Sequence, residues 1–131
     1  MGIEIQGPDL AVTAVRVRPG GVTVVGHDVI AGFRQRPAAE WGAQYGAFAR
    51  RVGAGHVAAA VLLPRAEVIV RTLEFPGVGE KDLATAVPLQ VDALHPFGED
   101  EAGFGWARLP GTDSVLIGVA HRGVIERYSR L

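Results

Sequence analysis

The apolar residues of this chain fall into short stretches, and nearly every stretch is ended by glycine or proline. The longest continuous run, Val57 to Leu63, has the length of a strand. A membrane-spanning helix needs about 20 apolar residues, so none is expected here. The pattern of the stretches alternates between strand-like and helix-like periods. This order predicts a mixed α and β domain made of short elements.

Three short antiparallel strands are expected within the first 33 residues. Ile3 to Ile5 and Leu10 to Val17 alternate apolar and polar residues, and Gly7-Pro8-Asp9 between them is typical of a turn. Pro19-Gly20-Gly21 then interrupts the pattern, which resumes from Val22 to Phe33. Glycine tolerates the positive φ of a tight hairpin turn, so the break predicts a hairpin.

A helix is expected from Pro37 to about residue 52, because proline suits the first turn and Gly53 can end the helix. One apolar stripe runs along it at spacings of four, three and four residues: Trp41, Tyr45, Phe48 and Val52. Such spacing favours packing against a core over stacking on a ligand.

The second half repeats the alternation of strands and helices. Val57 to Leu63 is apolar throughout, which predicts a strand covered on both faces. A helix over Glu80 to Leu94 should kink at Pro88, because proline removes a backbone hydrogen bond. The other expected elements are strands at residues 68–74, 103–109 and 114–120, and a last helix from about Arg122 that carries Val124, Tyr128 and Leu131 on one side.

Charge and composition favour a soluble, intracellular domain without disulfides. The 131 residues include 13 basic and 14 acidic side chains, so a general nucleic-acid-binding role is not favoured. There is no cysteine, which excludes thiolate zinc sites and cysteine nucleophiles. The first residues lack the basic and apolar regions of a signal peptide.

No set of side chains in the sequence indicates an active site. The four histidines, His27, His56, His95 and His121, lack metal-binding spacing and are expected to be solvated or to cap backbone groups. Neither of the two serines lies in a nucleophile elbow. We therefore expect no catalytic residue, no metal and no cofactor.

Four segments together resemble a known family. These are Leu63 to Pro76, Gly79 to Val87, His95-Pro96-Phe97, and Ser114 to Ala120 followed by a helix with Tyr128. Their order is similar to that in the PilM family of actin-like pilus assembly proteins. The resemblance covers roughly residues 57–131 well and the first 56 residues in outline.

The resemblance implies an actin-like, ribonuclease H-like fold with an inserted subdomain of the kind found in FtsA. Residues 1–62 together with 119–131 would form a partial first lobe of three antiparallel strands, a helix and a further strand. Residues 63–118 would form the inserted strand-helix-strand-strand subdomain. The fold class is thus mixed α+β.

The resemblance also implies a non-catalytic assembly module of a type IV pilus machine. Such a protein would be cytoplasmic and held at the inner membrane by a partner, PilN, whose cytoplasmic tail it binds in a groove. By position, the residues of that groove would be Leu63, Arg65, Arg71, Phe75 and Phe97. From the residues alone, the three apolar ones are more typical of core, and the arginines of solvated surface.

The phosphate-binding loop of actin-like proteins is not matched. Where the family reads Asp-x-Gly-Ser/Thr, this chain reads Glu4-Ile5-Gln6-Gly7-Pro8-Asp9, and Pro8 has no backbone N–H to donate. ATP and magnesium are therefore expected only in a longer parent protein. Two alternatives stay open: the cytoplasmic domain of an L-class protein of type II secretion, with a secretion ATPase as partner, or a fragment of an actin-like ATPase.

A homodimer is a further expectation. The resemblance implies that the sheet of the first lobe lacks a neighbour beside Val57 to Leu63, and an unpaired edge can pair with a second chain. Exchange of the terminal helix between two copies would be another route to a dimer.

Overall fold

A computed structural model describes residues 1–98 and 100–130. The chain divides into two compact units, Met1–Pro64 and Arg65–Leu131. Each unit is a sheet with helices, and together they form the mixed α+β fold that the sequence predicts. Leu131, expected on the stripe of the last helix, lies outside the described residues.

The first unit contains a four-stranded mixed sheet. Its strands are β1 (Gly2–Gln6), β2 (Asp9–Arg18), β3 (Gly21–Ile30) and β4 (Ala60–Leu62), in the order β3-β2-β1-β4. The first three strands are antiparallel and β4 runs parallel to β1. Gly7 and Gly20 have φ of 62° and 97°, as the tight turns require. The three predicted strands are confirmed.

One helix, α1 (Ala38–Arg51), packs on this sheet after a short 3-10 turn η1 (Phe33–Gln35). Phe48 is the fully buried member of the predicted stripe, while Trp41 and Tyr45 are half-buried. The Trp41 ring meets Phe33 edge-on, at 5.9 Å between centroids. The stripe therefore faces the core, as its spacing predicts.

The prediction for Val57 to Leu63 is wrong in two respects. Only Ala60–Leu62 forms a strand, and Val57 and Leu62 are 56% and 60% exposed instead of covered on both faces. The reason is the position of β4 at the end of the sheet, where it pairs with β1 on one side only. An apolar run alone does not distinguish such an edge strand from a central one.

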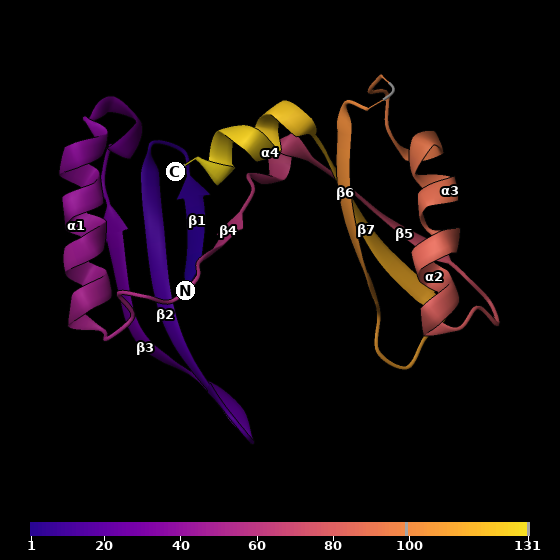
Figure 1. The fold of residues 1–131 in the computed structure, drawn as a ribbon, viewed down its shortest axis with the longest axis horizontal. Helices are drawn as coiled ribbons and strands as arrows, with labels where there is room; N and C mark the ends of the chain where they lie inside the picture. Colours follow the sequence, from indigo (N-terminus) through magenta and orange to yellow (C-terminus); the bar gives the residue numbers. More distant parts are fainter. Residues whose placement is uncertain (99, 131) are drawn as a thin grey trace. The chain divides into compact units, whose positions relative to one another are not determined.

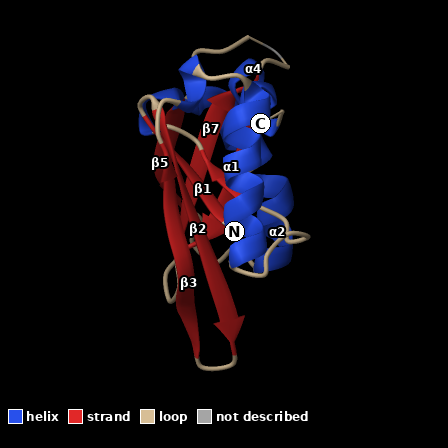
Figure 2. Cartoon of the chain, turned by 90° about the vertical axis from the view of Figure 1, so that its left-hand side faces the viewer, coloured by secondary structure: helices blue, strands red, loops and turns tan. Residues whose placement is uncertain are grey.

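The β2–β3 hairpin projects beyond the rest of its sheet (Figures 1 and 2). This is because β1 pairs with β2 only from Asp9 to Thr13. The strand register puts four valines on one face of the projecting part, between 43% and 73% exposed: Val15, Val17, Val22 and Val24.

The second unit contains a three-stranded antiparallel sheet in the order β5-β7-β6. The strands are β5 (Val68–Glu74), β6 (Ala102–Arg108) and β7 (Ser114–His121). The helical elements are η2 (Arg65–Glu67), α2 (Glu80–Ala86), α3 (Pro88–Val91), η3 (Asp92–Leu94) and α4 (Arg122–Ser129). The predicted helix over 80–94 is thus broken at Pro88, which confirms the expected kink.

The core of the second unit lies between α2, α3 and one face of the sheet, as Figure 1 shows. Leu83, Val87 and Val91 from the helices pack with Val115, Ile117 and Val119 of β7. The terminal helix α4 contacts β6 and β7, so within this chain residues 119–131 lie with the second unit. Their membership of the first lobe of an actin-like parent stays a prediction.

Candidate functional site

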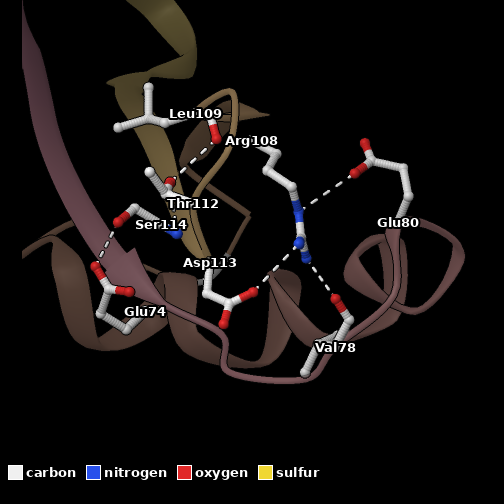
Figure 3. Close-up of polar contacts among 8 residues, drawn as sticks. All are labelled: Glu74, Val78, Glu80, Arg108, Leu109, Thr112, Asp113 and Ser114. Atoms are coloured by element: carbon white, nitrogen blue, oxygen red, sulfur yellow. Dashed lines mark hydrogen bonds and ion pairs between the residues drawn. The ribbon is translucent and has the colours of Figure 1, made fainter.

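A polar cluster ties the β6–β7 hairpin to the start of α2 (Figure 3). The Arg108 guanidinium donates to the carbonyl oxygen of Val78 and makes ion pairs with Glu80 at 3.4 Å and Asp113 at 3.6 Å. Ser114 Oγ donates to the Glu74 carboxylate across the ends of β7 and β5. These charged and polar groups pair with one another, so their role is to hold the hairpin in place.

A cavity that can admit a ligand lies elsewhere in the second unit, where the helical segment α3–η3 ends. It has a volume of about 600 Å³, within the usual range of ligand pockets. Its lining comes from α3, η3, the loop that follows, the start of β6 and the first residue of α4: Pro88, Val91, Asp92, His95, Phe97, Gly98, Asp100, Ala102, Phe104 and Arg122.

His95 is the chemically unusual residue of this pocket. Its side chain is only 4% exposed, and its Nδ1 accepts the backbone N–H of Phe97 at 3.1 Å. Because Nδ1 accepts, the neutral ring carries its hydrogen on Nε2. That buried Nε2 has no hydrogen-bond partner among the described residues, and the Asp92 carboxylate is 4.0 Å away. A buried donor left without an acceptor costs about 1–3 kcal/mol.

Aromatic rings form much of the apolar surface of the pocket. Phe97 stacks on His95, with 5.2 Å between ring centroids and 24° between planes, and meets the His121 ring edge-on at 5.4 Å. Phe104 on β6 is 44% exposed although it lies on the same side of the strand as the half-buried Trp106. The helices thus leave part of the core face of β6 uncovered.

Three charged residues line the pocket: Asp92, Asp100 and Arg122. Arg122 donates from Nε to the carbonyl oxygen of Asp100 at 2.9 Å and from Nη2 to that of Ala102 at 3.4 Å. Its positive charge is therefore directed at backbone oxygens. Asp92 is fully exposed, and Asp100 has a φ of 63°, a conformation that non-glycine residues rarely adopt.

The histidines only partly follow the expectation from the sequence. His121 Nδ1 accepts the N–H of Gly123 at 3.1 Å and so caps α4, and His27 and His56 are exposed. His95 also accepts a backbone N–H, but its ring is not solvated. Its burial depends on the stacked Phe97 and on the helix end before it, which no local pattern indicates.

The five predicted partner-binding residues do not form one cluster within the second unit, and their role stays a prediction. Phe97 lines the pocket, whereas Phe75 is buried in the core at 8% exposure. Arg65 and Arg71 are exposed and donate to the nearby carbonyl oxygens of Val68 and Val70. Leu63 is half-buried in the first unit, after β4.

Among residues 1–98 and 100–130, no three histidine, aspartate or glutamate side chains lie close enough together to hold a metal ion. In the same part of the chain, no helix is both long and apolar enough to cross a bilayer.

Comparison with known proteins identifies the fold. No family model and no curated protein matches the sequence. Among solved structures, a PilM-PilN type IV pilus biogenesis complex matches 98% of this chain at a TM-score of 0.68 and 15% identity. The cytoplasmic domain of EpsL, an inner membrane component of the type II secretion system of Vibrio cholerae, matches 98% at a TM-score of 0.61 and 13% identity.

The chain spans less than the full length of either structure, 42% of the first and 50% of the second. Identities this low carry information on the fold alone. The two structural matches confirm the fold that the sequence motifs imply: this chain folds like part of the actin-like proteins PilM and EpsL.

Proposed function

We propose that this chain is a non-catalytic component of a pilus or secretion assembly machine and that it binds the cytoplasmic tail of a membrane protein. The observation that carries the proposal is the match over 98% of the chain to a structure of PilM with PilN. Such a component would act on the cytoplasmic side of the inner membrane, held there by its partner.

The chemistry of the described residues supports a binding role over catalysis. The pocket lining contains no serine, threonine, cysteine, tyrosine or lysine. Its acidic and imidazole side chains are Asp92, which is fully exposed, Asp100, and His95, whose Nδ1 already accepts the Phe97 N–H. The Ser114 hydroxyl, outside the pocket, donates to the Glu74 carboxylate. The β1–β2 turn contains Pro8, which cannot donate to a phosphate.

A second candidate follows from the match to EpsL. EpsL is an inner membrane component of a type II secretion system. If the parent machine of this chain is of that kind, the family resemblance implies a secretion ATPase as the partner. The two candidates share the fold and the non-catalytic role and differ in the partner.

The test uses the chain together with the candidate partners encoded near its gene. Calorimetry should detect binding of a synthetic cytoplasmic tail from a PilN-like membrane protein, with no heat on addition of a secretion ATPase. The reverse result would favour the second candidate. Binding of neither, with hydrolysis of ATP in the presence of magnesium, would contradict both.

The same assay tests the predicted groove. Arg71→Glu should weaken binding of the tail, and Arg16→Glu serves as a control with the same change of charge on the projecting hairpin. Equal binding by both variants and the wild type would remove Arg71 from the site.

A further inference from the structure

We infer that the pocket at the end of η3 binds an extended peptide in which an apolar side chain is flanked by lysine or arginine, and that His95 Nε2 donates to a backbone carbonyl of that peptide. The inference rests on the proposed function in one respect, that the ligand is a peptide. It adds the chemistry of the segment and the residues that recognise it.

His95 carries a hydrogen-bond donor that lacks an acceptor in the described part of the chain. His95 Nε2 is buried and has no partner within the described residues, while Nδ1 is already an acceptor for Phe97. His95 lines the pocket, so a ligand that displaces the atoms covering Nε2 can supply the missing acceptor. A peptide carbonyl oxygen supplies one without bringing a net charge into a buried place.

Two aspartates bring negative charge to the pocket. Asp92 lies 4.0 Å from His95 Nε2 and is fully exposed, and Asp100 lines the same pocket. Arg122, the one cationic side chain of the lining, already donates to two backbone carbonyls. A carboxylate or phosphate ligand would meet these aspartates, whereas a flanking lysine or arginine would be attracted to them.

The pocket also has an apolar surface, which lies beside the edge strand β6. Phe97 and Phe104 provide rings against which an aliphatic side chain can pack. Phe104 belongs to β6, which pairs with β7 on one side and forms the edge of its sheet. An extended segment can pair with such an edge through its backbone, and this places its side chains next to the pocket.

The experiment measures fluorescence polarisation of labelled peptides with the intact chain. One nine-residue probe carries a central leucine between lysines, and the matched probe carries the same leucine between glutamates. We expect saturable binding of the lysine probe and at least tenfold weaker binding of the glutamate probe. No binding of the lysine probe, or equal binding of both, would overturn the inference.

Two variants test the named residues. His95→Phe keeps a ring that can stack on Phe97 but removes the donor, and it should weaken the lysine probe about tenfold, which corresponds to about 1.4 kcal/mol. His56→Phe, at an exposed histidine of the first unit, should bind normally. Asp92→Asn should weaken binding and reduce its dependence on salt, whereas Glu126→Gln, on an exposed face of α4, should not.

Thermal melts show whether each variant is folded, so that lost binding can be distinguished from lost structure. His95→Phe removes the unpaired donor at Nε2 but also the Nδ1 acceptor of the Phe97 N–H, so its melting temperature shows whether the loop after η3 stays folded. If this variant is folded and binds the lysine probe as well as the wild type does, His95 is not the donor and the inference fails.

Binding of the PilN-like tail and binding of the lysine probe test the proposed function and the pocket separately. Binding of the PilN-like tail that is unchanged by His95→Phe would leave the proposed function standing and overturn the pocket assignment. Binding of the lysine probe without binding of any partner tail would support the pocket and contradict the proposed partner.

Discussion

Replacement of Gly26 by alanine should destabilise the first unit, because Gly26 lies where α1 crosses β3. A Cβ atom at this position would be 2.5 Å from Val52 Cγ1 and 3.3 Å from Phe48 Cε2. Carbon atoms in contact are about 3.5–4.0 Å apart, so the Val52 side chain must move by roughly 1 Å. Phe48 is almost fully buried and has little room to yield.

The size of the effect follows from two opposing contributions. Overpacking of a core costs about 1–3 kcal/mol. Alanine in a strand gains about 0.5–1 kcal/mol over glycine. We therefore expect Gly26→Ala to lower the free energy of unfolding by about 1–2 kcal/mol. Gly21→Ala is a matched control on the same strand, since nothing lies within 4 Å of its added Cβ, and it should be neutral or slightly stabilising.

The assay follows urea unfolding by tryptophan fluorescence. The chain has two tryptophans, Trp41 in the first unit and Trp106 in the second, so a Trp106→Phe background reports the first unit alone. The decisive measurement is a double-mutant cycle with Val52→Ala, which removes the clashing methyl group. Gly26→Ala should cost much less in that background. Additive effects, or equal costs for Gly26→Ala and Gly21→Ala, would refute the packing argument.

Three other predictions follow from the same structure. Phe48→Ala should lower the free energy of unfolding by about 3–5 kcal/mol, and Trp41→Ala by less because Trp41 is half-buried; calorimetric melts that rank them the other way would contradict this. Light scattering at about 100 μM should detect self-association, since both ends of the first sheet, β3 and β4, are edges; a strict monomer would rule it out. The chain with magnesium and ATP should release no phosphate above the buffer rate, and release that is lost in Glu4→Ala would oppose a non-catalytic role.

Elements defined by local chemistry could be predicted from the sequence. Pro88 breaks its helix because of what proline lacks, and Gly20 turns its hairpin because glycine tolerates positive φ. The helical spacing of the α1 stripe correctly indicated which face meets the core. In each case the cause lies within a few residues of the effect.

Features decided by tertiary position could not be predicted in this way. The run Val57 to Leu63 looks like a central strand, but its exposure depends on which neighbours the sheet supplies. Only part of the candidate site is predicted from the sequence: the family resemblance indicates Phe97. The burial of its neighbour His95 is not predicted, because it depends on how Phe97 stacks on the ring and on the helix end before it.

The order of the strands in the second sheet has a consequence for synthesis on the ribosome. The central strand, β7, is the last of the three to be made, since the order in space is β5-β7-β6. Until β7 emerges, β5 and β6 lack the strand with which each pairs. About 40 residues separate the end of β5 from the start of β7, or roughly 2–8 s of translation.

During that interval the nascent chain carries two unpaired strands and the apolar side of α2 and α3. Val115, Ile117 and Val119, which complete the core, arrive together on one strand. The second unit should therefore fold in one late step, and its dependence on chaperones should be greatest just before β7 emerges.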